Sequence, residues 1–294
     1  MLTSFLTSLA LMASAATMSS NNTASNTGAE IRYDNRGRPV IATQVNEQGP
    51  YYMVVDTAAE TSLIVPALAK ILKVDSVDSG LTINGATGKV KANMYPIDHF
   101  SSPLFNVSQV GLLELPNPSS TPAAGIIGMD LFADSALVFN FNERRMTVEP
   151  SGEAKTNEMV IPAIKDNRLL IRVMITLNGV EIPALIDTGA AATIANSAVL
   201  KALGWQADDP HLVDDGDIRG ATTDTSAIKK ASIDTVKIGG MTMRNIPIRF
   251  IETPDEVPAN LILGSDILNS LIGFTLDFPR QEFRVMFPMK DEEK

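Results

Sequence analysis

The sequence predicts a mostly β protein built from two similar lobes related by pseudo-twofold symmetry, with few, short helices. The chain has 294 residues, which is enough for two domains of ordinary size. Six segments of the first half recur in the same order in the second half, so both halves share one succession of elements. Most segments are short, rich in Val, Ile and Phe, and bounded by turn residues, as is typical of strands.

The repeat can be followed segment by segment. The first half contains VIATQV, YYMVVD, PALAKIL, NGATGK, AGIIGMDLF and LVFNFNERRMTV, at 40–45, 51–56, 66–72, 84–89, 124–132 and 137–148. The second half contains LLIRVMITL, IPALID, SAVLKAL, RGATTD, NLILGSDIL and IGFTLDFPRQEFRV, at 169–177, 182–187, 197–203, 219–224, 260–268 and 272–285. The spacing is also kept, because Asp56 precedes Gly128 by 72 residues (128 − 56) and Asp187 precedes Gly264 by 77 (264 − 187).

Local signals place hairpins and helices within this pattern. An Asn-Gly pair separates two apolar runs at 177–182, which is a strong hairpin signal. A Gly-Gly pair within 236–250 predicts a second hairpin. Short helices are expected at 66–73 and 197–203, with a helical turn after the late glycine of each half.

A charged run containing Pro and Gly, EPSGEAKTNE (149–158), separates the two halves. The expected organisation is a leader (1–28), a first lobe (29–150), a linker (151–158), a second lobe (159–288) and a charged tail (289–294).

Composition excludes several classes of function. The chain carries 24 basic and 34 acidic residues, and the net charge of −10 argues against a nucleic-acid partner. Because there is no cysteine, disulfides, thiolate chemistry and cysteine-type zinc sites are excluded. Only His99 and His211 are present, which argues against a histidine-rich metal site and a Ser-His-Asp triad.

The N-terminus predicts export to the periplasm or the outside of the cell. FLTSLALMASAA (5–16) resembles the apolar core of a secretory signal, and ASA (13–15) has the small-x-small form of a cleavage site. The alternative is a disordered leader on a cytoplasmic protein, continuing into TMSSNNTASNTG (17–28). No uninterrupted apolar run is long enough to span a bilayer, so no integral membrane span is expected.

Each half ends an apolar strand with Asp-Thr and a small residue: Asp56-Thr57-Ala58 and Asp187-Thr188-Gly189. If the lobes face each other about a pseudo-twofold axis, the two carboxyl groups meet at the interface. Two carboxylates in contact share one proton, so one can take a proton from water while the other donates to a carbonyl oxygen. This arrangement hydrolyses an amide without a metal or cofactor, and it predicts Asp56 and Asp187 as catalytic residues.

The sequence resembles the retropepsin-like aspartic proteases, in particular the bacterial single-chain members that carry two such units. The resemblance covers most of 35–288 and rests on two motifs in each half. One is hydrophobic-hydrophobic-Asp-Thr-Gly/Ala, and the other is the later hydrophobic-hydrophobic-Gly-x-Asp, seen in Ile126-Ile127-Gly128 and Ile262-Leu263-Gly264. It implies two β-barrel lobes, with each late glycine segment running beside the catalytic loop.

The resemblance also implies supporting and substrate-binding residues. The supporting residues are Thr57, Ala58, Thr188 and Gly189, the hydroxyl residues Ser62 and Thr193, and the glycines Gly128 and Gly264. The threonines would exchange hydrogen bonds across the lobe interface. The hairpin that closes over bound peptide would lie at Gly85 to Gly88 in the first lobe and at Gly220 to Thr223 in the second. Glu60 would bind substrate backbone, while Ala191 stands at the equivalent position, which predicts an asymmetric cleft.

Other patterns favour ordinary structural roles. GATGK (85–89) lacks the Ser or Thr that follows the lysine of a phosphate-binding loop, and no long helix follows it. DDGD (214–217) does not have the spacing of a calcium-binding EF-hand loop. Asp130 and Asp266 are expected to be structural hydrogen-bonding groups near the two loops.

The sequence therefore predicts a monomeric aspartic endopeptidase that cleaves polypeptides in a cleft between its lobes. Two alternatives stay open. The departure at Ala58 and the divergence of the lobes are compatible with an inactive peptide- or protein-binding module on the same fold. In the other alternative, each lobe pairs with a lobe of another chain in a domain-swapped dimer.

Overall fold

The computed structural model of the protein describes residues 28–85, 88–118, 121–165, 169–219 and 225–288. The predicted leader up to residue 27, Gly220 and the predicted tail lie outside these ranges. Within them, no helix is both long and apolar enough to cross a membrane.

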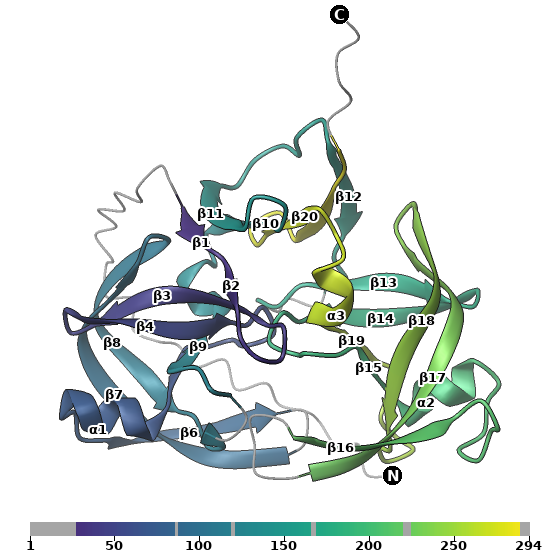
Figure 1. Ribbon diagram of the computed structural model, residues 1–294, viewed down its shortest axis with the longest axis horizontal. Helices are drawn as coiled ribbons and strands as arrows, with labels where there is room; N and C mark the ends of the chain where they lie inside the picture. Colours follow the sequence, from purple (N-terminus) through teal and green to yellow (C-terminus); the bar gives the residue numbers. More distant parts are fainter. Residues whose placement is uncertain (1–27, 86–87, 119–120, 166–168, 220–224, 289–294) are drawn as a thin grey trace, which may run out of the picture.

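Six strands of the first half close into a barrel, seen on the left of Figure 1. In spatial order they are β3 (Pro39–Val45), β4 (Gln48–Val55), β9 (Gly125–Ile127), β5 (Leu63–Ile64), β8 (Phe105–Glu114) and β7 (Gly88–Ser102). Pairing between Val45 and Phe100 closes the barrel. Two further strands, β2 (Arg32–Tyr33) and β6 (Val77–Gly85), extend it beside β3 and β7.

The second half repeats this barrel with the same connections, on the right of Figure 1. Its strands are β13 (Arg172–Leu177), β14 (Val180–Ile186), β19 (Leu261–Leu263), β15 (Ile194–Asn196), β18 (Met241–Ile251) and β17 (Thr225–Ile238). Leu177 pairs with Val236 to close it, and β16 (Val213–Arg219) extends β17. The prediction of two similar β-barrel lobes is confirmed.

The predicted hairpins and helices are also confirmed. Asn178 and Gly179 form the turn between β13 and β14 with positive φ angles of 46° and 88°, which Asn and Gly tolerate best. The described helices are short: α1 (Pro66–Leu72), α2 (Ser197–Ala202) and α3 (Ser265–Leu268), with a 3₁₀ turn η2 (Met129–Leu131). Because η2 and α3 each begin directly after a late glycine, the chain turns sharply there in both lobes.

A third sheet joins the lobes and is shared between them, at the top of Figure 1. Its order is β1 (Ala29–Glu30), β11 (Arg145–Pro150), β10 (Ser135–Asn140), β20 (Gly273–Asp277), β21 (Glu282–Met286) and β12 (Glu158–Pro162). β10 of the first half pairs directly with β20 of the second, with Phe139 opposite Phe274. The repeat pattern assigned both segments to their own lobes and did not predict that they form one sheet.

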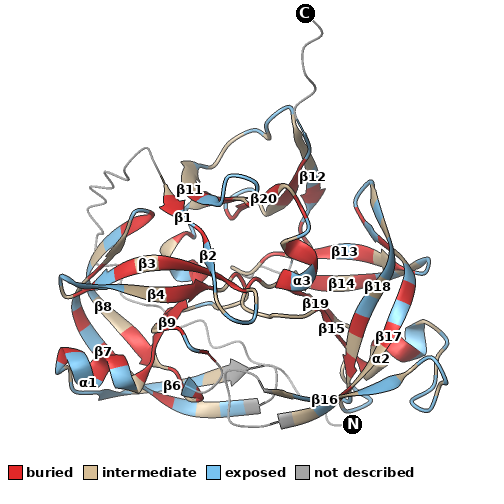
Figure 2. Ribbon diagram, viewed as in Figure 1, coloured by how far each residue is buried: buried red, intermediate tan, exposed pale blue. Residues whose placement is uncertain are grey.

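Aromatic packing makes the shared sheet a continuation of the core. The rings of Phe139 and Phe274 stack with centroids 4.5 Å apart, and Phe283 meets Phe274 edge-on at 5.5 Å. All three side chains are fully buried, and Figure 2 shows β20 in the buried colour, whereas most of β11 is in the intermediate or exposed colour. Because large aromatic side chains contribute most to burial energy, these contacts join the two halves firmly.

Candidate active site

Each predicted catalytic aspartate follows a strand whose last residue is buried and which lies parallel to the strand before the late glycine. In the first lobe, β4 runs parallel to β9, and the Asp56 backbone N–H donates to the Ile127 carbonyl at 3.0 Å. In the second lobe, β14 runs parallel to β19, and the Asp187 N–H donates to the Leu263 carbonyl, also at 3.0 Å. The first loop, which follows β4 and carries Asp56, and the second loop, which follows β14 and carries Asp187, therefore begin in the same way.

Hydroxyl side chains brace the first loop from behind. Ser62 Oγ accepts a hydrogen bond from the Gly128 N–H at 3.0 Å and donates to Asp130 Oδ1 at 3.2 Å. A Cβ atom on Gly128 would lie 2.4 Å from the backbone carbon of Thr61, so only glycine allows this approach.

The second loop is braced by equivalent residues. Thr193 Oγ1 accepts from the Gly264 N–H at 3.0 Å and donates to Asp266 Oδ1 at 2.7 Å. A Cβ on Gly264 would lie 2.5 Å from the backbone of Ala192. The structural roles expected for Asp130 and Asp266 agree with these hydrogen bonds.

Thr57 and Thr188 join the two loops across the lobe interface. The Thr57 N–H donates to Thr188 Oγ1 at 3.2 Å, and the Thr188 N–H donates to Thr57 Oγ1 at 3.0 Å. Each hydroxyl also donates to a carbonyl at the end of a strand in the opposite lobe. Thr57 Oγ1 donates to the Ile186 carbonyl at 2.7 Å, and Thr188 Oγ1 donates to the Val55 carbonyl at 2.5 Å. Both threonines are buried, so these bonds have no competition from solvent.

This exchange brings Asp56 and Asp187 together. Their carboxyl groups interact with each other, and each also accepts a backbone N–H bond, from Ala58 at 2.9 Å and from Ala190 at 2.8 Å. Burial raises the pKa of both groups, and the negative charge of Asp56 raises the pKa of Asp187 further. Both residues are still partly exposed at the surface, so water can reach the pair.

The predicted substrate-binding residues lie at the rim of this arrangement or outside the described residues. Glu60 is exposed on the loop after Asp56. Gly85 and Gly88 pair with each other at the end of the β6–β7 hairpin, whose tip at 86–87 is not described. β16 and β17 form the corresponding hairpin of the second lobe, and its predicted tip at Gly220 also lies outside the described residues.

Sequence reasoning missed Arg38 and its partner Asp34. Arg38 Nη1 donates to the Gly189 carbonyl of the other lobe at 3.3 Å, directly beside the aspartate pair. Its Nη2 forms an ion pair with Asp34 Oδ2 at 2.7 Å, and both side chains are more than nine-tenths buried. The repeat contained no signal for this residue, because the contact crosses between lobes and has no copy in the second half.

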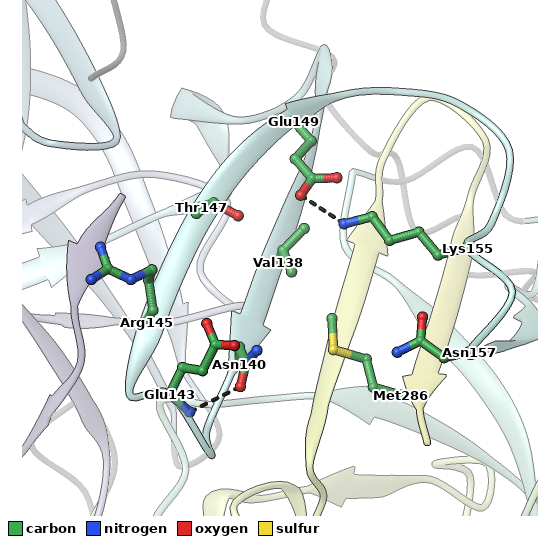
Figure 3. Close-up of a pocket in the computed structure, with 9 residues that line it drawn as sticks. All are labelled: Val138, Asn140, Glu143, Arg145, Thr147, Glu149, Lys155, Asn157 and Met286. Atoms are coloured by element: carbon green, nitrogen blue, oxygen red, sulfur yellow. Dashed lines mark hydrogen bonds and ion pairs between the residues drawn. The ribbon is translucent and has the colours of Figure 1, made fainter. Parts of the chain in front are cut away.

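The described residues contain no group of three His, Asp or Glu side chains that could hold a metal ion. A polar pocket of about 280 Å³ opens on the shared sheet, where Figure 3 shows Asn140, Arg145, Lys155 and Asn157 among its lining residues. The predicted site residues do not line it.

Both halves of the chain are similar to known proteins. A family model described as "Aspartyl protease" matches residues 41–131 and again residues 173–267, which together exceed half of the chain. A solved structure of a retropepsin-like aspartic protease from Rickettsia conorii matches with 18% identity and a TM-score of 0.36. That match covers 44% of this chain and 90% of the other. No curated protein matches the sequence significantly.

Proposed function

Because the chain belongs to the aspartyl protease family, we propose that it is an aspartic endopeptidase in which Asp56 and Asp187 activate water between the two lobes. The observation that carries the proposal is the exchange of hydrogen bonds between Thr57 and Thr188, with the Asp56 carboxyl lying over Gly189, so that the two carboxyl groups are neighbours where the lobes meet. Such a pair holds one proton in the acidic to neutral range, since two adjacent carboxylates cannot both ionise easily.

The pair can carry out both proton transfers of amide hydrolysis. The ionised carboxylate accepts a proton from the water as its oxygen attacks the carbonyl carbon, while the protonated carboxyl donates to the carbonyl oxygen. Thr57, Ala58, Thr188 and Gly189 form the hydrogen-bonded floor that holds the two carboxyl groups in register. A polypeptide is the substrate, and one chain supplies both halves of the site, so the active species is a monomer.

Substitution of either aspartate tests this function directly. Asp56→Asn and Asp187→Asn each keep the side-chain shape but leave the pair without a shared titratable proton. We expect wild type to cleave denatured casein between about pH 4 and pH 7, and each variant to lose detectable cleavage. Thermal unfolding of the variants controls for loss of fold. Cleavage that persists in either variant would contradict the proposal, and a folded wild type that binds casein without cleaving it would favour an inactive binding module.

Substrate capture is proposed to be asymmetric between the lobes. Glu60 is exposed beside the first loop, whereas Ala191 occupies the equivalent place in the second, so backbone capture is stronger on the first-lobe side. The β6–β7 and β16–β17 hairpins are proposed to cover the bound peptide, with Gly85 and Gly88 at the end of the first. We expect Glu60→Ala to change the cleavage profile of a peptide library, while Glu181→Ala, at an exposed glutamate of β14, leaves it unchanged. Identical profiles for Glu60→Ala and wild type would contradict this role.

A further inference from the structure

The connection between β2 and β3 reaches from the first lobe to the second. Arg38 Nη1 donates to the Gly189 carbonyl at 3.3 Å, and Asn269, directly after α3, donates from Nδ2 to the Gly37 carbonyl at 2.7 Å. The first contact holds the connection against the loop that carries Asp187, and the second holds it against the end of α3 in the same lobe. A guanidinium group is therefore fixed beside the aspartate pair.

Asp34 orients this guanidinium group. Its Oδ2 accepts from Arg38 Nε at 2.8 Å and pairs with Nη2 at 2.7 Å, while its Oδ1 accepts the backbone N–H groups of Arg36 and Arg38. The Arg38 side chain is 8% exposed and that of Asp34 is 3% exposed. Because Asp34 occupies the edge formed by Nε and Nη2, the opposite edge, with Nη1, faces the second-lobe loop.

Gly189, whose carbonyl accepts the hydrogen bond from Arg38, also lies against Asp56. A Cβ atom on Gly189 would lie 2.2 Å from both Cγ and Oδ2 of Asp56, so the Asp56 carboxyl occupies the space over Gly189. Arg38 binds the carbonyl of this same glycine. The positive charge and the Asp56 carboxyl therefore converge on one residue of the second lobe.

Among the described residues, the second-lobe position equivalent to Arg38 holds no cation. In the first lobe Val40 pairs with Val54, two residues before Asp56, and in the second Arg172 pairs with Leu185, two residues before Asp187. Two residues before Val40 stands Arg38, and two before Arg172 stands Leu170. The two aspartates are therefore placed almost symmetrically, but the electrostatic environment around Asp56 differs from that around Asp187.

We propose that Arg38 is a positioning residue that assigns the shared proton: it makes Asp56 the ionised carboxylate and leaves the proton on Asp187. This inference rests on the proposed function for its catalytic meaning. Asp56 then accepts the proton of the attacking water, and Asp187 gives its proton to the substrate carbonyl oxygen. The product of this step is a neutral gem-diol, with Asp56 protonated and Asp187 ionised, so atoms and charges balance.

The electrostatics of the site support this assignment. Burial raises the pKa of Asp56 while the Arg38 charge opposes that rise, whereas burial and the negative charge of Asp56 both raise the pKa of Asp187. In the described part of the chain, the acidic groups bound to the bracing hydroxyls behind the loops are Asp130 and Asp266. Burial raises the pKa of Asp130 to about 6, so it is mostly neutral in acid. Asp266 is bound to Thr193 and the N–H of Ile267, on the second-lobe side.

The test follows the protonation of the two carboxyl groups without requiring cleavage. The full chain is labelled with ¹³C at aspartate Cγ, and the two signals are assigned from Asp56→Asn and Asp187→Asn. We expect the Asp56 signal of wild type to follow the lower titration step and the Asp187 signal the higher one. In Arg38→Met the lower step moves up by about one pH unit, the small end of the shift expected for loss of a nearby opposite charge.

Further variants keep the test interpretable. Arg38→Met leaves the Asp34 carboxylate buried without its cation. The double variant Asp34→Asn with Arg38→Met therefore removes both charges together. In this double variant the lower titration step should still move to higher pH. Arg38→Lys keeps the charge and should keep the order of the two signals. Arg32→Met, at an exposed arginine of β2, should change neither step. The proposal would be overturned if the titration steps were the same with and without the Arg38 charge. It would also be overturned if Asp187 ionised before Asp56 in wild type.

Activity provides the second measurement and separates this inference from the proposed function. In an active enzyme, the acidic limb of the kcat/KM profile should move with the lower titration step in Arg38→Met. If the signals shift as expected but wild type cleaves nothing, the protease function fails while the proton assignment stands. If cleavage depends on both aspartates but the titration steps of the two signals are unchanged in Arg38→Met, only the proton assignment fails.

Discussion

Gly189 and Ala58 occupy equivalent places after the two aspartates, but the space around Gly189 is filled by a carboxyl group. The Asp56 Cγ and Oδ2 atoms lie 2.2 Å from the position that a Cβ on Gly189 would take. The methyl group of Ala58 is already accommodated in the first lobe. One motif therefore tolerates Ala while the other requires Gly, a distinction that the two triplets do not reveal by themselves.

We expect Gly189→Ala to lower kcat/KM by about 100-fold or more, because a displacement of about 1 Å at a catalytic group can cost that much. Ala58→Gly is the matched change in the other lobe and should keep activity within a few-fold of wild type. Steady-state cleavage of one peptide by both variants, with unfolding curves to confirm the fold, measures the difference. Equal losses in the two variants would contradict this account of the loop.

The two loop-bracing elements differ in how their aspartates are bound. Asp130, at η2, is bonded to Ser62, and burial of its carboxyl raises its pKa to about 6 although part of the residue is exposed. Asp266, in α3, accepts bonds from both the N–H and the hydroxyl of Thr193, at 3.0 and 2.7 Å. The first element therefore prefers a neutral side chain, whereas the second uses both carboxylate oxygens as acceptors.

These elements should respond oppositely to amide substitution. A raised folded-state pKa means that the stability contributed by Asp130 is present below about pH 4 and is lost as pH rises through about 6. Asp130→Asn should therefore gain stability relative to wild type between pH 4 and pH 7. Asp266→Asn turns an amide donor toward the Thr193 N–H and should lose about 1–3 kcal/mol at pH 7. Urea midpoints at both pH values test this, and a destabilised Asp130→Asn at pH 7 would contradict it.

At the scale of the whole molecule, the shared sheet fixes how the lobes face each other. Arg284 of β21 is buried within it and contacts three acidic side chains: Asp277 at 2.8 Å, Glu282 at 2.5 Å and Glu158 at 4.0 Å. It also donates to the Gly152 carbonyl at 2.7 Å, and Ser151 donates to Asp277. This network attaches the connection between the halves to the second half's own strands.

Loss of this arginine should destabilise the entire molecule. Arg284→Met leaves buried carboxylates without their cation, and we expect a loss of about 3–5 kcal/mol. Arg280→Met removes a neighbouring arginine that is 39% exposed and should cost less than about 1 kcal/mol. Urea denaturation at pH 7 measures both variants. Trp205 fluorescence, which reports on the second lobe, should coincide with far-UV circular dichroism if the lobes unfold together.

Solution mass belongs to the same scale. Since β10 and β20 pair within one chain, wild type should sediment with the mass of a single chain. A dimer mass would instead favour exchange of lobes between chains.

Most of the fold and the core of the candidate site could be predicted from the sequence. The repeat predicted both barrels, and the short helices and the Asn178-Gly179 turn were predicted from local signals. The residues around Asp56 and Asp187 were predictable because each half carries its own copy of the motifs, and strand ends and tight turns depend on nearby residues.

Only the tertiary structure decided the features that depend on contacts between the halves. Phe139 and Phe274 look like strand residues of separate lobes in the sequence, and their pairing appears only in the shared sheet. Arg38 reads as one charged residue among several, but burial and the contact with Gly189 give it a defined place beside the pair. The physical reason is range: local patterns determine which strands and turns form, whereas a repeat describes each half alone and is silent on how packing joins them.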